Sequence, residues 1–225
     1  MQRLPHIDQQ YEAEVQALTS ALVTMGLHAE SQIGDAVRAL VDRDPNLARQ
    51  VVQNDRDLNR MENETDLLCI KLMARRAPVG EDLRLVTCAL KTVVDMERIG
   101  DLAVNVAKRY LELNAGGPGL EPTPEILALT RGALDITRRA MGALQNRDGA
   151  AARTIRTEDS RIDDLNRAVF QQMILVAKDH SDQLERAIAY TSIARYLERV
   201  ADHAVNIAEM VVFLIEGKVI RHAPD

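Results

Sequence analysis

The sequence has no tryptophan, two phenylalanines and four tyrosines, so aromatic residues make up only 3% of its 225 residues. Aliphatic side chains must therefore fill the interior, and a composition rich in Ala, Leu, Val, Glu and Arg favours packed helices over strands. No apolar run approaches the roughly 20 residues that span a bilayer. The N-terminal stretch MQRLPHIDQQYEAE lacks the apolar segment of a signal peptide, so we expect a cytoplasmic protein.

Cysteine is also scarce, and acidic residues outnumber basic ones by 34 to 28. Cys69 and Cys88 are the only cysteines, and each lies within an apolar helical pattern. Two isolated cysteines are typical of reduced core residues rather than of a disulfide framework or a metal site. The net charge of −6 provides no basic surface for nucleic acid and would instead suit a cation or a basic protein surface.

An internal repeat is the clearest feature that is present. ERIGDLAVNVA begins at Glu97 and ERVADHAVNIA begins at Glu198, and seven of the eleven positions are identical. The turn NRD at Asp148 likewise matches DRD at Asp44. Because such self-similarity is the signature of a duplicated structural unit, the chain is predicted to contain the same unit twice.

Each half shows three long helical patterns. Apolar residues spaced by three and four predict helices over about 11–40, 47–72 and 83–111, and again over about 129–144, 155–176 and 184–212. The Gly- and Pro-rich stretch after Asn114 marks a boundary. We therefore predict an all-α protein with two tandem antiparallel three-helix bundles, over residues 6–115 and 125–217, joined by a linker at 116–124.

The third helix of each half has a second apolar stripe beside its main one. The stripe contains Met96, Ile99, Ala103, Val106 and Tyr110 in the first half, and Ile193, Leu197, Val200, Ala204, Ile207 and Val211 in the second. A helix that is apolar over so much of its circumference must be largely covered. These extra faces exceed what one three-helix unit can cover, so a homodimer is also predicted.

Polar side chains at intervals of four interrupt the same helices. Glu97, Asp101 and Asn105 share one face of the first, and Glu198, Asp202 and Asn206 share the matching face of the second. The neighbouring antiparallel helix should bring further oxygen donors alongside. These are Asp55, Asn59 and Glu62 in the first half and Asp159, Asp163 and Asn166 in the second.

We call the two rows, Glu97/Asp101/Asn105 and Glu198/Asp202/Asn206, the carboxylate ladders. Two interpretations of these ladders remain open. Arg98 and Arg199, each three residues before an Asp, could form a purely structural ion-pair network. Alternatively, four converging oxygen-bearing side chains could bind metal. We predict one centre at Glu97, Asp101, Asp55 and Asn59, and another at Glu198, Asp202, Asp159 and Asp163. Asn105, Asn206, Glu62, Asn166, Arg98 and Arg199 would surround the two centres.

The ligand types limit the chemistry. No Glu-x-x-His occurs, which disfavours a ferritin-like di-iron oxidase. All-oxygen ligands suit Mg, Mn, Ca or Fe, and we predict a divalent or trivalent ion, with Fe, Mn, Mg or Zn as candidates. No phosphate-binding glycine loop, nucleophile elbow or Ser/His/Asp grouping is present, so the protein is not expected to be an enzyme.

Three stretches resemble the PhoU family of phosphate-specific transport accessory proteins. They are APVGEDLR at Ala77, MERIGDLAVNVAKR at Met96 and RYLERVADHAVNIAEM at Arg195, and the similarity extends from about Tyr11 to Glu216. The second half departs from the family pattern because AKDHSDQLER has no counterpart of Pro78. The resemblance implies two three-helix PhoU domains whose carboxylate motifs bind metal clusters in some members.

The resemblance also implies a function. PhoU-like proteins restrain phosphate-starvation signalling by connecting the ATPase subunit of the Pst phosphate transporter to the sensor kinase PhoR, so this chain would meet the membrane only through partners. Two alternatives are a metal-dependent phosphoryl hydrolase that uses clustered ions and a metal-free helical scaffold held by salt bridges.

Overall fold

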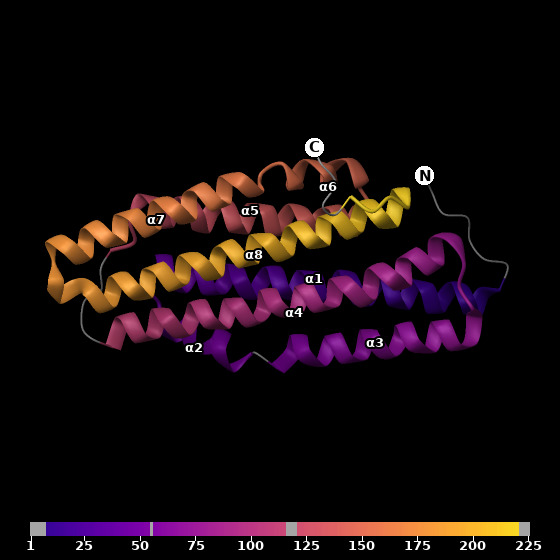
Figure 1. Cartoon of the computed structure of the whole chain (residues 1–225). Helices are drawn as coiled ribbons and strands as arrows, with labels where there is room; N and C mark the ends of the chain where they lie inside the picture. The colour runs from indigo at the N-terminus through magenta and orange to yellow at the C-terminus, as the bar shows by residue number, and fades with distance from the viewer. Residues whose placement is uncertain (1–7, 55, 116–120, 221–225) are drawn as a thin grey trace.

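The structure is a computed structural model that describes residues 8–54, 56–115 and 121–220, with the side chains of Ala115 and Asp159 left undescribed. All the regular elements of these residues are helices, as predicted (Figure 1). In the first repeat they are α1 (Gln9–Val41), α2 (Pro45–Gln53), α3 (Arg56–Arg76) and α4 (Gly80–Ala115). In the second they are α5 (Pro124–Asn146), α6 (Gly149–Arg156), α7 (Asp159–Asp179), the short 3-10 helix η1 (Ser181–Gln183) and α8 (Leu184–Glu216).

Equivalent side chains begin equivalent helices in the two repeats. The Asp44 carboxylate accepts hydrogen bonds from the Asn46 and Leu47 amides at the start of α2. Asp148, in the matching position, accepts one from the Ala151 amide at the start of α6. Such caps satisfy amide groups that would otherwise lack partners, so the repeated sequence produces a repeated chain reversal.

The predicted second helix is divided in both repeats. α2 ends at Gln53 and α3 begins at Arg56, and α6 ends at Arg156 three residues before α7. The sequences at the two breaks, QNDRD and RTEDS, are rich in short polar side chains that compete for backbone hydrogen bonds and favour turns. Periodicity alone did not predict these breaks because the apolar spacing continues across them.

α4 and α8 lie side by side and antiparallel along the middle of the molecule, with α3 beyond α4 and α7 beyond α8 (Figure 1). α1 and α5 lie behind this pair and contact each other. The second apolar stripes of these two helices are buried in this arrangement; Ile99, Val106, Val200 and Ile207 each have 0% exposure. The two repeats therefore share one hydrophobic core. Each repeat covers the extra apolar face of the other, so these stripes do not by themselves require a second copy of the chain.

The antiparallel packing relates the repeats by an approximate two-fold axis. The turn between α3 and α4 lies at one end of the molecule and the turn from α7 to α8 lies at the other (Figure 1). Near the centre, Asp95 of α4 contacts both His203 and Asn206 of α8. Among the described residues, no helix is both long and apolar enough to span a bilayer.

Candidate metal centre

The carboxylate ladder of the first repeat lies on the edge of α4 that faces α3. The Glu97 side chain is 13% exposed and that of Asp101 is 35% exposed. Arg98 contacts both, with 3.5 Å from its Nε to a Glu97 oxygen and 3.0 Å from its Nη1 to an Asp101 oxygen. The first repeat thus forms the ion pair that the salt-bridge interpretation requires.

The ladder nevertheless carries more negative charge than Arg98 neutralises. Burial raises the pKa of Glu97, the Asp101 and Glu62 charges raise it further, and Arg98 only partly opposes them. The pKa of Glu62 is also raised, first by burial and then by the neighbouring Asp66. Clustered carboxylates with raised pKa values are typical of sites that gain stability from a cation.

A close approach of two helices brings Glu62 to the ladder. A Cβ atom placed on Gly100, between Glu97 and Asp101, would lie 2.3 Å from the Leu58 Cδ1. The missing side chain therefore lets α3 approach α4 at this level, and Glu62 follows Leu58 by one turn. Glu62, predicted as a peripheral group, is the α3 carboxylate whose charge acts on both Glu97 and Asp101.

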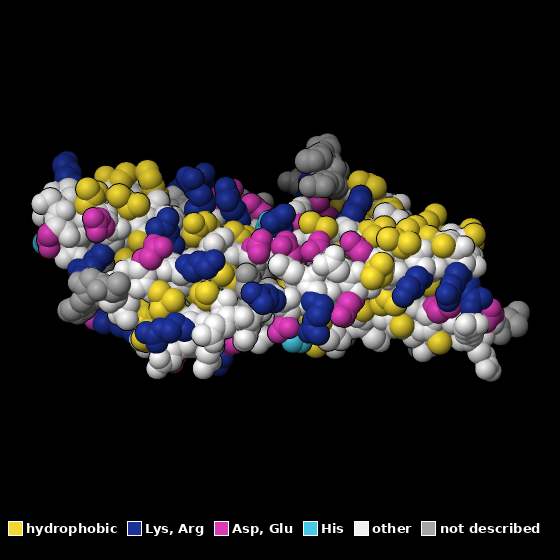
Figure 2. All heavy atoms as spheres, turned by 90° about the horizontal axis from the view of Figure 1, so that it is seen from below, with side chains coloured by type: hydrophobic (Ala, Val, Ile, Leu, Met, Phe, Trp, Pro, Cys, Tyr) yellow, Lys and Arg dark blue, Asp and Glu magenta, His cyan; other side chains and the backbone are white. Residues whose placement is uncertain are grey.

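The other predicted first-centre residues are placed differently. Asn59 is exposed, and its main-chain oxygen accepts a 2.7 Å hydrogen bond from Asn63. Asp55 lies outside the described residues. The reason is the helix phase: Leu58 faces the core at 2% exposure, so Asn59 turns toward solvent. Figure 2 views the molecule from the side on which α2 and α3 lie, and it shows a row of Asp and Glu side chains at the middle of that face.

The second ladder has similar electrostatics but a different neighbouring carboxylate. Burial raises the pKa of Glu198, and the Asp202 and Asp163 charges raise it further. α7 therefore does bring Asp163 beside the Glu198 ladder, as predicted. Arg199 lowers the Glu198 pKa, as does Arg195, which sequence reasoning did not include. Asp159 begins α7, and its side chain lies outside the described part of the structure.

The asparagines predicted around the centres divide into two kinds. Asn206 donates a 3.2 Å hydrogen bond to Asp95 of α4, so its amide joins the two repeats. Asn105 and Asn166 are half-buried. The Asp95 carboxylate also contacts His203 Nδ1 at 2.8 Å. A sequence signal for this cluster was the presence of His203 where the first repeat has Leu102, because an unmatched polar residue indicates a contact that the repeat does not share.

The donor chemistry of both ladders fits a hard cation, because every charged candidate ligand offers carboxylate oxygen. Within residues 8–54, 56–115 and 121–220, no three His, Cys, Asp or Glu side chains are gathered tightly enough to hold an ion. Binding would therefore require side-chain movement or the two candidate carboxylates, Asp55 and Asp159, whose side chains are not described. Metal coordination remains a prediction for this chain.

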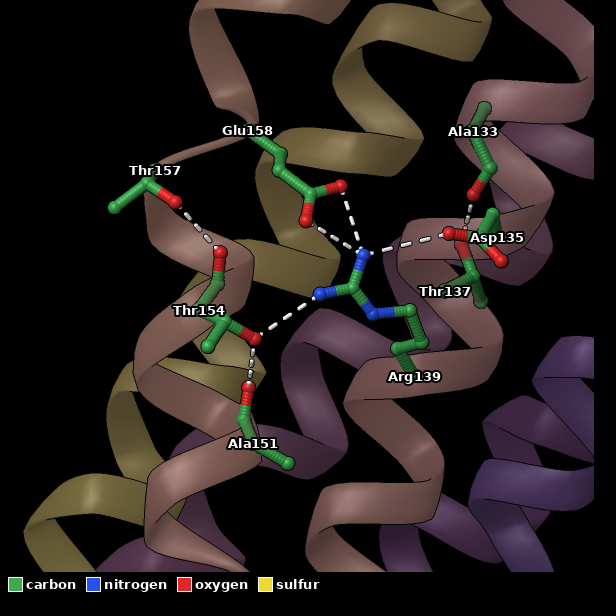
Figure 3. A network of polar contacts seen from close by, with 8 residues as sticks. All are labelled: Ala133, Asp135, Thr137, Arg139, Ala151, Thr154, Thr157 and Glu158. Carbon is green, nitrogen blue, oxygen red and sulfur yellow. Dashed lines mark hydrogen bonds and ion pairs between the residues drawn. The ribbon is translucent and has the colours of Figure 1, made fainter.

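A separate polar network fixes the start of α7 in the second repeat (Figure 3). The Arg139 guanidinium on α5 donates to both Glu158 oxygens at 2.7 and 2.8 Å, and to Thr154 at 3.0 Å. Asp135 lies 3.4 Å from the same guanidinium. Glu158 immediately precedes Asp159, so this network positions the backbone from which that candidate ligand extends. Asp35 occupies the position in α1 that matches Arg139.

Comparison with known proteins places this architecture among characterised relatives. The PhoU domain family model matches residues 22–110 and 126–211, which correspond to the two repeats. A Pseudomonas aeruginosa protein described as a phosphate-specific transport system accessory protein PhoU homolog is 35% identical over 96% of this chain and 90% of its own length. The Escherichia coli phosphate-specific transport system accessory protein PhoU is 29% identical, with the same coverage of both proteins.

Solved structures agree along nearly the whole chain. The crystal structure of PhoU from Pseudomonas aeruginosa has a TM-score of 0.88 and 33% identity, and the match covers 92% of this chain and all of that one. The phosphate transport system regulatory protein PhoU from Streptococcus pneumoniae has a TM-score of 0.84 and 25% identity, covering 93% of this chain and 98% of that one.

Proposed function

This chain belongs to the PhoU family, and from that premise we propose that it is an accessory regulator of phosphate transport that acts through protein contacts. The observation that carries the proposal is that the family match includes both repeats, while the Pseudomonas aeruginosa and Escherichia coli relatives are each matched over 90% of their own length. The names of those relatives supply the process, and the absence of a recognisable catalytic motif in the sequence favours regulation over turnover.

We propose specific partners as well. In this proposal the protein links the ATPase subunit of the Pst transporter to the sensor kinase PhoR, restrains expression of phosphate-starvation genes, and works in the cytoplasm as a homodimer. The acidic net charge of −6 would favour basic contact surfaces on these partners. Binding that depends on such rim charges should weaken as salt rises, because the Debye length falls from over 10 Å to a few ångströms between about 0.05 and 0.5 M.

Gene deletion with reporter measurement tests the regulatory role. A strain that lacks the gene should express phosphate-starvation genes in high phosphate, and the wild-type gene should restore repression. Full repression without the gene would refute the proposal.

Pull-down of purified Pst ATPase and PhoR cytoplasmic domains, at low and high salt, tests the partners separately. Light scattering that shows a monomer of about 25 kDa at micromolar protein would refute the homodimer.

We further propose that the two carboxylate ladders bind divalent or trivalent metal ions that stabilise the regulator. Support comes from the raised pKa values of Glu97 and Glu198, whose first cause is burial and whose second is the charge of neighbouring carboxylates. Bound metal would supply positive charge there, while Arg98 and Arg199 would balance the remaining carboxylates. Elemental analysis of protein purified without chelator or metal-affinity tag tests this proposal directly.

Two alternatives have observations of their own. The clustered carboxylates would also suit a metal-dependent phosphoryl hydrolase, which predicts phosphate release from esters by the metal-loaded protein. The contact between Arg98 and Asp101 favours a metal-free scaffold in the first repeat. Elemental analysis and an ester-hydrolysis assay on the same preparation separate these alternatives from the regulator.

A further inference from the structure

A groove of about 480 Å³ runs between α7 and α8, and its lining includes the core residues Met173 and Ala187. Apolar side chains line its outer part, toward the turn from α7 to α8. Phe170, Ile174, Leu184 and Ile188 are each between 50% and 56% exposed, although all four are large hydrophobic residues. Contiguous exposed apolar side chains that line a groove mark a surface on which another molecule packs.

The inner part of the same groove is basic. Arg195 and Arg199 line it, both are exposed, and their spacing of four residues places them on one face of α8. Neither lies within ion-pair distance of a described carboxylate, whereas Arg98, Arg139 and Arg153 all do so. Their charges reach Glu198 from a greater distance and lower its pKa. The groove therefore presents an apolar outer part and two guanidinium groups that can each receive a carboxylate.

We propose that the α7–α8 groove docks a helix of a partner protein, apolar along one face and bearing two carboxylates one turn apart at one end. Helices that bind in grooves use apolar anchors at intervals of three and four residues. Such anchors would pack against the exposed apolar side chains of the groove. The carboxylates would pair with Arg195 and Arg199, and this charge complementarity sets the orientation of the helix.

The first repeat does not present the same surface. Ile70 and Leu83, which match Ile174 and Leu184, are also exposed, at 53% and 46%. Val94, however, occupies the position that matches Arg195, and Arg98, which matches Arg199, is paired with Glu97 and Asp101. The acidic helix should consequently bind the second repeat, at one site per chain.

This inference rests on the proposed role as a protein-binding regulator, but its test does not use gene expression. The probe is a fluorescein-labelled amphipathic helical peptide with Leu at i, i+3, i+4 and i+7 and two Glu one turn apart at one end. A second peptide has Lys in place of both Glu. Fluorescence anisotropy with the full chain should show saturable binding of the acidic peptide, at one peptide per chain, and much weaker binding of the basic peptide.

Matched variants locate the site. Leu184→Asp should weaken binding of the acidic peptide by about tenfold or more, while Leu83→Asp, at the equivalent position of the first repeat, should change it by less than about twofold. The double variant R195E/R199E should reverse the preference and bind the basic peptide. All these positions are exposed, and circular dichroism must show unchanged helix content at the temperature of the binding measurement. R195E/R199E should melt at a lower temperature, because it adds negative charge beside Glu198, so its binding is measured well below that temperature.

Several results would overturn the proposal. They are no saturable peptide binding, equal loss with Leu83→Asp and Leu184→Asp, or no reversal of peptide preference in R195E/R199E. Displacement of the peptide by millimolar inorganic phosphate alone would assign the arginines to a small-anion site instead of a docked helix. Any of these outcomes leaves the regulatory role to be decided by the gene-deletion reporter, so the two failures are distinguishable.

Discussion

Asp95 of α4 and His203 of α8 are 108 residues apart in sequence, yet 2.8 Å separates the Asp95 carboxylate from His203 Nδ1. Asn206, one turn along α8 from Asp202, donates to the same oxygen at 3.2 Å. The contact is half-buried, with side-chain exposures of 26% for His203 and 17% for Asp95. It joins the two repeats across their shared interface, where a polar contact fixes the register of two otherwise apolar helix faces.

The Asp95–His203 contact should therefore contribute to stability as a coupled pair. We expect Asp95→Ala and His203→Ala each to lower the free energy of unfolding by about 1–2 kcal/mol, since each leaves a partly buried polar group without its partner. A double-mutant cycle by urea denaturation should give a coupling energy of about 1 kcal/mol. Additive losses would contradict a direct interaction.

Removing one repelled carboxylate should stabilise the chelator-treated protein. Burial and the Asp202 and Asp163 charges disfavour the ionised form of Glu198 and raise its pKa. Glu198→Gln should accordingly raise the melting temperature at pH 7 by roughly 1–2 °C, which corresponds to about 0.5 kcal/mol in a chain of this size. Because the pKa of Glu198 in the folded protein lies above 4.5, the folded state binds protons more readily than the unfolded state.

The pH dependence follows from that sign. The destabilisation by Glu198 is complete above its folded pKa and disappears as the pH falls below 4.5, so the advantage of Glu198→Gln should shrink over this window. Differential scanning fluorimetry of both proteins in chelator, from pH 7 to pH 4.5, measures the difference. An advantage that is constant with pH would mean that charge is not its cause.

Metal should reverse the order of these stabilities. If the ladders are ligands, a cation at 100 times its dissociation constant adds about 2.7 kcal/mol, or roughly 5–10 °C, to the wild-type protein. The double variant Glu198→Gln/Asp202→Asn should lose the part of this shift that its site supplies. Thermal melts with Mn or Mg after chelator treatment measure it. Equal shifts in both proteins would favour the salt-bridge interpretation.

Metal-induced stabilisation should also weaken on acidification, because protons compete for the carboxylates.

The Arg139 network should stabilise the junction of α6 and α7. Arg139 and Glu158 are only 33% and 34% exposed, and Arg139 also contacts Thr154. Arg139→Ala should cost about 1 kcal/mol, since charge-assisted bonds of partly buried groups exceed typical surface ion pairs. Arg167→Ala is the control, because Arg167 and its partner Asp164 are both 69% exposed, and it should cost less than about 0.5 kcal/mol. Similar losses in urea denaturation would contradict the structural role of the network.

Two helical glycines should respond to alanine in opposite directions. A Cβ atom on Gly100 would lie 2.3 Å from the Leu58 Cδ1, so Gly100→Ala should destabilise the protein by about 1–2 kcal/mol. A Cβ atom on Gly142 would meet nothing within 4 Å, so Gly142→Ala should stabilise it by about 0.5–1 kcal/mol through helix propensity alone. Urea denaturation gives both values, and a stabilising Gly100→Ala would show that α3 has no need of this close approach.

The sequence by itself determined the helices, the duplication and the carboxylate ladders. Apolar spacing depends on local helical geometry, so the long patterns through α1, α4, α5 and α8 could be recognised without tertiary information. The repeat of Glu97 and Asp101 as Glu198 and Asp202 could be recognised for the same reason, because residues four apart share a helix face wherever the helix packs.

Only the tertiary structure decided which side chains meet across helices. The phase of α3 against α4 depends on how Leu58 packs over Gly100, and it brought Glu62 rather than Asn59 to the first ladder. The antiparallel pairing of α4 with α8 likewise buried both second apolar stripes and joined Asp95 to His203. Such contacts depend on helix rotation and register, which are set by the fit of side chains from distant parts of the chain and not by any local spacing.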